Sequence, residues 1–440
     1  MIESGFIAAI DLGTSKITGV VARKNEDNIV SVLACETTQS KKCIRRGLVY
    51  NIEDTGANVR KVITKLENKL GKKIAKVYVS IAGQSLHTIT HKVNKQLSSS
   101  GLVTETVIEQ MRNEAEKFRP DMSRLYGIAD VEYIVNGKAE HQPVGVATSE
   151  IEGNYQMIVG RPNIITNIDK SIIDKANLEI AGYVVGPLAS ARIALNENEK
   201  ELGCAFIDFG AGTSSLSIYK GGKLRYMVVI PFGGATITQD ICELNFIESE
   251  AEMYKIKFGK THDTQDVSFF NSFASKPNID IPSLNQVIEM RIQEIVVNIE
   301  QQIKLSGYEG KLGGGLVITG GASQLRNLNL YLEKKLDMPV RKASAKKTFI
   351  NNFPELANDP SLTQALGLLL YAHENCEEQV DEVLEVEYPI DSTTDTPKTP
   401  KKKEKKRREA KTPGRGIMDM VGGLFGSIGN MFEEEYDDDN

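Results

Sequence analysis

Residues 6–20 read Phe6-Ile-Ala-Ala-Ile-Asp11-Leu-Gly13-Thr14-Ser15-Lys16-Ile-Thr-Gly-Val20. Two short apolar runs flank a turn, which is typical of two β-strands joined by a tight loop. The loop combines a glycine that allows close approach with two hydroxyls and an ammonium group, all suited to a phosphate. Asp11 ends the first run, where a carboxylate could hold the hydration shell of Mg²⁺. Taken alone, the pattern is more typical of an ordinary hairpin turn.

The same plan occurs a second time. Residues 205–219 read Ala205-Phe-Ile-Asp208-Phe-Gly210-Ala-Gly212-Thr213-Ser214-Ser215-Leu-Ser-Ile-Tyr219. A third piece, Gly314-Gly-Leu-Val-Ile-Thr319-Gly320-Gly321-Ala322-Ser323, predicts a strand that runs into a glycine pair and a helix. Because an internal repeat is evidence about architecture, we expect two like domains that could close on one nucleotide from both sides.

Three such pieces in this order resemble the actin/Hsp70/sugar-kinase ATPase superfamily, which has two phosphate loops and an adenosine loop. The resemblance implies an α/β fold of the two-lobed actin-like (ribonuclease H-like) ATPase type, with an inserted small α+β subdomain and a disordered C-terminal linker. It also implies ATP and Mg²⁺ as cofactors, with the metal held through water near Asp11 and Asp208. The cofactor-binding residues carried over are Asp11, Gly13, Thr14, Ser15, Lys16, Asp208, Gly210, Gly212, Thr213, Ser214, Glu252, Lys255, Gly320, Gly321 and Ser323.

The composition is that of an ordinary globular protein with more than one domain. A length of 440 residues with 40% hydrophobic content allows sizeable cores, and the formal charge of −6 argues against a nucleic-acid-binding protein overall. The five cysteines show no ligand spacing, which favours a reducing cytoplasm. His87 and His91 are expected to be solvated strand residues and not metal ligands. We expect no secretory signal peptide and no membrane span.

Shifts in composition and in the spacing of apolar residues along the chain predict six parts. They are a first actin-like subdomain (IA, 1–82 plus 160–195), an inserted subdomain (1C, 83–159), a second actin-like subdomain (IIA, 196–243 plus 306–385), a small subdomain (IIB, 244–305), a basic disordered linker (386–413) and an amphipathic membrane-targeting helix (414–435). The apolar pattern predicts helices over residues 54–70, 104–118, 168–181 and 283–305. Two further helices rich in small residues, over 184–195 and 362–372, are expected to be hinges between the lobes.

Further motifs narrow the resemblance. Gly233-Gly-x-x-Ile-Thr-x-Asp-Ile, Glu250-Ala-Glu-x-x-Lys255 and Val317-Ile-Thr-Gly-Gly-Ala322 are similar to FtsA, a family of actin-like membrane anchors of bacterial cell division. Glu252 and Lys255 are three residues apart on one helix face, where they could meet a base or ribose or form a solvated ion pair. The family implies self-assembly into a polymer, other division proteins as partners, and docking of the FtsZ C-terminal peptide on residues 244–305. Arg291 is a candidate contact there, or an ordinary solvated side chain.

The C-terminal segment predicts a reversible membrane anchor. Residues 398–411 hold nine Lys or Arg against two Glu, and the segment after them has an apolar face about 160° wide on a helical wheel. An apolar face beside a polybasic run is the two-signal pattern of surface binding to anionic lipid. A protein groove for the helix, or nucleic acid for the basic run, is the less favoured alternative. The expected membrane-binding residues are Ile417, Met420, Val421, Leu424, Phe425, Ile428, Met431 and Phe432.

The resemblance and the tail together imply an ATP-binding protein that self-assembles and tethers the FtsZ ring to the cytoplasmic side of the cell membrane at the division site. The alternatives are a sugar-kinase-like phosphotransferase, for which no general base is evident, and a PilM-type pilus assembly protein, which lacks the amphipathic tail. Ser215 stands where many relatives have Asp. Gly186 stands where polymerising relatives such as MreB often have a Glu that orients the attacking water. We therefore expect no catalytic residue and at most slow hydrolysis of ATP.

Overall fold

The structure is a computed structural model that describes residues 5–40, 42–98, 101–261, 279–350 and 352–378. All of these belong to one unit of the chain, residues 1–380, which is distinct from residues 381–440. The predicted basic linker (386–413) and the predicted membrane helix (414–435) therefore lie outside the described residues. Within those ranges no helix is both long enough and apolar enough to cross a membrane.

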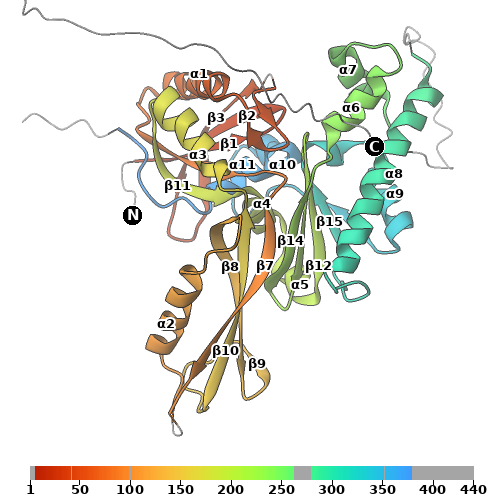
Figure 1. Ribbon diagram of the computed structural model, residues 1–440. Helices are drawn as coiled ribbons and strands as arrows, with labels where there is room; N and C mark the ends of the chain where they lie inside the picture. The colour runs from red at the N-terminus through yellow and green to blue at the C-terminus, as the bar shows by residue number, and fades with distance from the viewer. Residues whose placement is uncertain (1–4, 41, 99–100, 262–278, 351, 379–440) are drawn as a thin grey trace, which may run out of the picture. The chain divides into compact units, whose positions relative to one another are not determined.

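The first apolar repeat forms part of a five-stranded sheet with the strand order β11-β6-β1-β2-β3. Figure 1 labels β1, β2, β3 and β11 of this sheet. Its strands are β1 (Ile7–Leu12), β2 (Lys16–Lys24), β3 (Val30–Gln39), β6 (Lys76–Ile81) and β11 (Glu179–Val185). β1 and β2 are antiparallel neighbours joined by the first loop, whereas β6 lies parallel to β1 and to β11. A short hairpin, β4 (Ile44–Arg45) and β5 (Leu48–Val49), follows β3.

Helix α1 (Ile52–Leu70) covers this sheet along β2 and β3. Its start is set by Asn51, whose side chain accepts a hydrogen bond from the Asp54 N–H, and its end by Gly71 in the left-handed region at φ 66°. These are the cap residues that helix termini favour, and they match the helix predicted over 54–70. The buried side of α1 carries Val59, Val62 and Leu66, which join the core of the first sheet.

The second apolar repeat lies in a nine-stranded sheet with the order β16-β15-β12-β13-β14-β7-β10-β8-β9. The strands are β7 (His87–Gln96), β8 (Arg124–Val135), β9 (Lys138–Glu140), β10 (Glu150–Gly160), β12 (Cys204–Phe209), β13 (Ser214–Lys220), β14 (Lys223–Ile230), β15 (Leu316–Thr319) and β16 (Val340–Lys342). Strands β7 to β10 and α2 (Glu105–Glu116) share an apolar core of their own, and we call this group of elements the insert, after the segment predicted over 83–159.

The insert joins the second repeat through strand pairing and polar contacts. β14 and β7 share a single pair, Val228 and His87. Beside it, Asp130 Oδ2 accepts a hydrogen bond from the Leu224 N–H at 2.8 Å, and Glu132 forms an ion pair with Arg225 at 2.8 Å. The insert therefore belongs to the first half of the chain by sequence but is hydrogen-bonded to a strand of the second half. We call this set of contacts the insert seam.

The remaining helices flank the two sheets. They are α3 (Asn163–Asp169), α4 (Gly186–Ala194), α5 (Glu197–Leu202), α6 (Gly234–Cys242), α7 (Glu248–Phe258), α8 (Ile281–Leu305), α9 (Leu328–Leu336), α10 (Pro354–Asn358) and α11 (Thr363–Leu368), with a π-helical segment η1 (Lys170–Lys175) and two 3₁₀ turns, η2 (Gly321–Gln324) and η3 (Pro360–Leu362).

One predicted helix is wrong in its second half. The helix expected over 168–181 ends with the π-helical segment η1, and Asn177 then adopts a left-handed conformation at φ 56°. Asparagine is among the residues that most readily take this conformation, which stops a right-handed helix. The chain continues as strand β11, which pairs in parallel with β6.

The two predicted hinge helices, α4 and α11, are packed directly against each other. Gly367 of α11 lies on the backbone of Ala189 in α4, so closely that an added Cβ would be 2.2 Å from the Ala189 carbonyl oxygen. Small residues at the crossing therefore let the two helix backbones touch. Both helices belong to the core of the first sheet, and each carries one polar side chain to the site described next.

Candidate functional site

A cavity of about 430 Å³ lies where the two repeated loops and the glycine pair meet. The predicted site residues that line it are Asp11, Gly13, Thr14, Ser15, Lys16, Asp208, Gly210, Gly212, Thr213, Glu252, Lys255, Gly320 and Gly321. Ser214 and Ser323 are buried and are not among the lining residues. Their hydroxyls donate to the carbonyls of Phe232, at 2.8 Å, and Gly320, at 2.7 Å, so they shape the loops from behind.

The two repeated loops are tight turns of the same form. An added Cβ on Gly13 would lie 2.6 Å from the Lys16 carbonyl oxygen, and one on Gly210 would lie 2.8 Å from the Thr213 carbonyl oxygen. A side chain at either place would open the turn, which explains the glycine at matching positions of the repeat. The loops also approach each other, because a Cβ on Gly212 would lie 2.6 Å from Thr14 Oγ1. Both loops therefore contribute to one end of the cavity.

Two aspartates carry the acidic chemistry of this end. Asp11 Oδ1 accepts hydrogen bonds from Ser80 Oγ at 2.9 Å and from Gln364 Nε2 at 2.5 Å, while Asp208 Oδ2 accepts one from Ser190 Oγ at 2.6 Å. Burial raises the pKa of Asp11, and burial together with the charge of Asp11 raises the pKa of Asp208 to about 6. Two buried carboxyls that line one cavity are suited to a cation.

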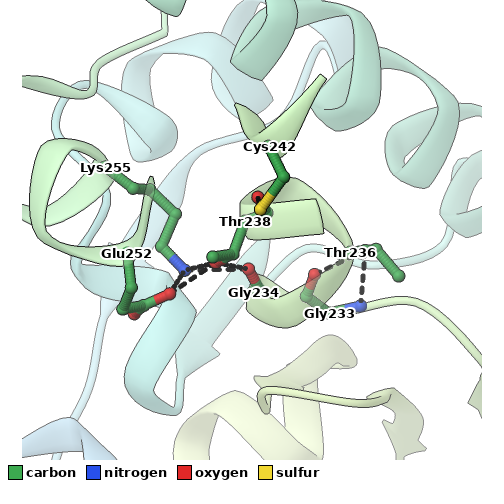
Figure 2. A network of polar contacts seen from close by, with 7 residues as sticks. All are labelled: Gly233, Gly234, Thr236, Thr238, Cys242, Glu252 and Lys255. Carbon is green, nitrogen blue, oxygen red and sulfur yellow. Dashed lines mark hydrogen bonds and ion pairs between the residues drawn. The ribbon is translucent and has the colours of Figure 1, made fainter. Parts of the chain in front are cut away.

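Basic groups enter the same cavity from two sides. Lys16 Nζ donates to Ser361 Oγ at 2.8 Å, which ties the first loop to the turn before α11. At the other end, Lys255 Nζ donates to the Gly234 carbonyl oxygen at 2.8 Å, to Thr238 Oγ1 at 2.7 Å and to Glu252 Oε2 at 2.7 Å (Figure 2). Burial lowers the pKa of Lys255 despite the neighbouring carboxylate of Glu252.

The contacts of Lys255 bear on whether Glu252 and Lys255 form only a solvated ion pair or face a binding site. Glu252 and Lys255 do form an ion pair, but it lines the cavity, and the Lys255 side chain is only 12% exposed. Thr238 also donates to Glu252, which joins the pair to α6 (Figure 2). Lys255 Nζ already donates three hydrogen bonds, whereas the Glu252 side chain is 45% exposed. The carboxylate of Glu252 is therefore the group that a polar ligand could reach.

Several lining or supporting residues were not predicted. Gln364, Ser361 and Gly47 line the cavity, and Ser80 and Ser190 hold the aspartates from outside it. A signal existed for two of them, since Ser190 and Gln364 lie within the predicted hinge helices. Ser361 and Gly47 carry no local signature.

Other predicted candidates lie elsewhere. Arg291 on α8 is not simply solvated: its guanidinium forms a two-point ion pair with Asp240 on α6, at 2.5 and 2.9 Å, and contacts Glu294. His87 and His91 lie on strand β7, as expected, and the described parts of the chain contain no cluster of metal-ligating side chains. His91 stacks on Phe118 instead, with ring centroids 4.1 Å apart.

Comparisons with known proteins agree with the fold and the motifs. A family model described as "Cell division protein FtsA" matches residues 205–367. The chain is 31% identical over 338 residues to cell division protein FtsA of Porphyromonas gingivalis, covering 75% of this chain and 70% of that protein. It is 27% identical to the protein of the same name from Pseudomonas aeruginosa, covering 84% and 90%. Among solved structures, the PilM–PilN type IV pilus biogenesis complex is similar in fold, with a TM-score of 0.60 at 16% identity over 83% of this chain and 98% of that chain.

Proposed function

Because this chain belongs to the FtsA family of actin-like cell division proteins, we propose that it binds ATP with Mg²⁺ in the cavity, assembles with further copies of itself, and tethers FtsZ to the cytoplasmic side of the membrane at the division site. Both the predicted family and the predicted actin-like fold are confirmed.

The observation that carries nucleotide binding is the pair of buried aspartates between two matched glycine loops. In this proposal the phosphates lie on the loop residues Gly13 to Lys16 and Gly210 to Thr213, whose backbone N–H groups and hydroxyls are donors. Gly320 and Gly321 leave room for the adenosine, and Glu252 with Lys255 supplies polar partners for its ribose or base. The thirteen predicted residues that line one cavity support this assignment.

The residues present also fit Mg²⁺. The ion prefers oxygen ligands and keeps several of its waters, and Asp11 and Asp208 offer carboxylate oxygens within one buried, polar end of the cavity. Bound there with nucleotide, it would neutralise charge on the phosphates.

For FtsZ, we propose a docking surface on the small subdomain, residues 244–305. Met290 and Val297 are seven residues apart on one side of α8, and their side chains are 66% and 56% exposed. Two large apolar side chains on one exposed helix face suit a short amphipathic peptide. Arg291 beside them is engaged with Asp240, so its role would be to fix α8 against α6.

The membrane tether rests on the sequence alone, since residues 414–435 lie outside the described ranges. Liposome co-sedimentation tests it directly, with vesicles containing anionic lipid, with and without ATP, and with the full chain and a chain ending at residue 413. We expect the full chain to pellet with the vesicles and the shortened chain to stay in solution. Equal pelleting of both chains would show that the tail is not the anchor. Isothermal titration with ATP and Mg²⁺ tests the cavity separately.

A further inference from the structure

Gln364 is placed to do more than fill space at the phosphate end of the cavity. Its Nε2 donates to Asp11 Oδ1 at 2.5 Å, across a separation of 353 residues in the chain. Because an ionised carboxylate can only accept, the amide nitrogen must face Asp11, which leaves the amide oxygen as an acceptor. Gln364 is a lining residue of the cavity, so this oxygen has access to a ligand or to water there.

The amide lies in the space that a side chain at position 186 would fill. Gly186 is the first residue of α4, and its φ lies outside the left-handed region, so the backbone does not require glycine there. An added Cβ at Gly186 would lie 2.5 Å from Gln364 Oε1 and 2.7 Å from its Cδ. Glycine is therefore needed to make room for the Gln364 amide. Helix α11 therefore carries the amide side chain, and the glycine at the start of helix α4 leaves the space for it.

We infer that Gln364 positions the water that attacks the terminal phosphate of ATP, from the space beside Gly186. The inference rests on the proposed binding of ATP. Gln364 fixes Asp11 through its amide nitrogen and accepts a hydrogen bond from that water through its amide oxygen.

The chemistry that this allows is limited. The water oxygen forms a bond to the terminal phosphorus, and the bond from that phosphorus to the bridging oxygen breaks, with its electron pair remaining on the diphosphate. The water proton passes to the released phosphate, because a neutral amide cannot take it. An amide that orients water without acting as a base is known in phosphoryl transfer. Positioning of the water without a general base is consistent with slow turnover of ATP.

The first test separates turnover from binding. Gln364→Leu keeps the approximate volume and removes the amide, so we expect kcat to fall at least tenfold while the Kd for ATP, measured by calorimetry with Mg²⁺, changes less than threefold. The matched control is Gln301→Leu, the same change at an exposed position of α8, which should leave both unchanged. A Gln364→Leu chain that binds ATP and hydrolyses it at the wild-type rate would overturn the inference.

The second test moves the amide from position 364 on helix α11 to position 186 on helix α4. Gly186→Asn in a Gln364→Ala background should restore turnover at least fivefold over Gln364→Ala alone, because the Cβ of residue 186 already starts beside the present amide. Gly186→Asn alone should lower the melting temperature, and this loss should shrink in the Gln364→Ala background, since the two side chains compete for one space. Additive changes in melting temperature would refute the shared space. If the wild-type chain bound no ATP at all, the proposed function itself would fail, an outcome that calorimetry distinguishes from the others.

Discussion

Gly367, at the crossing of the hinge helices α4 and α11, gives the sharpest prediction about the scaffold. In Gly367→Ala the new Cβ would lie 2.2 Å from the Ala189 carbonyl oxygen and 2.6 Å from its carbonyl carbon. Ordinary contacts between heavy atoms are about 3.5–4.0 Å, so the helices must separate locally by about 1.3 Å. Neither atom can rotate away, because both belong to the backbone.

The cost follows from this geometry. Overpacking a buried contact costs about 1–3 kcal/mol, and we expect the upper part of that range for a collision with backbone. Replacing glycine by alanine in a helix returns about 1 kcal/mol, which leaves a net loss of about 2 kcal/mol in the free energy of unfolding. Separation would also displace Ser190 from Asp208 and Gln364 from Asp11, so we expect ATP affinity to fall about tenfold, or roughly 1.4 kcal/mol.

Urea unfolding and calorimetric titration with ATP measure these two effects. Gly127→Ala is the matched control, because a Cβ on Gly127 in strand β8 would have no heavy atom within 4 Å and its φ is not left-handed. It should unfold within about 0.5 kcal/mol of wild type, as surface substitutions usually do. If Gly367→Ala matched the control in both measurements, the helix crossing would not be the tight contact that the argument requires.

Three other outcomes are expected. The pKa of Asp208 is raised from 3.8 to about 6, mainly by burial, so the folded protein binds this proton more tightly than the unfolded chain does; the free protein should gain stability as the pH falls through 6 toward 4. Because burial also raises the pKa of Asp11, melting curves across that range should show a larger gain in wild type than in Asp208→Asn, and equal gains would contradict the prediction. Changing Leu424 and Phe425 to Asp should abolish flotation with anionic liposomes and leave ATP binding intact; persistent flotation would point to a protein groove for the tail. Phosphate release by the wild-type chain should stay below the roughly 1–100 s⁻¹ of kinases, and a rate within that range would contradict an amide without a base.

Local pattern was enough to predict the parts of the site that lie next to each other in sequence. The two strand–loop–strand repeats carry their own signal, because Asp11 and Gly13 recur at the matching positions Asp208 and Gly210, and each loop also contains hydroxyl side chains. The glycine pair at 320–321 after a buried strand is equally local. The superfamily and its fold follow from the order of these three pieces, and the further motifs at 233–241, 250–255 and 317–322 narrow the resemblance to the family.

What the sequence could not show depends on contacts between distant segments. Gln364 meets Asp11 across 353 residues, and its fit against Gly186 depends on how two helices cross. The pairing of the insert with β14 likewise leaves no trace in the strand pattern of either segment. The helix expected over 168–181 was wrong for a local reason that was visible, since Asn177 is a good left-handed stop before a strand.

The insert seam has a mechanical consequence. The two halves that form the cavity are connected through α4 and α11, and the insert adds a further connection through Asp130, Glu132 and the single β14–β7 pair. Any hinge rotation that widens the cavity must either swing the insert along with β14 or detach it. We therefore expect the orientation of the insert to change with occupancy of the cavity, and a partner bound to the outer end of the insert to alter the rate at which a ligand leaves.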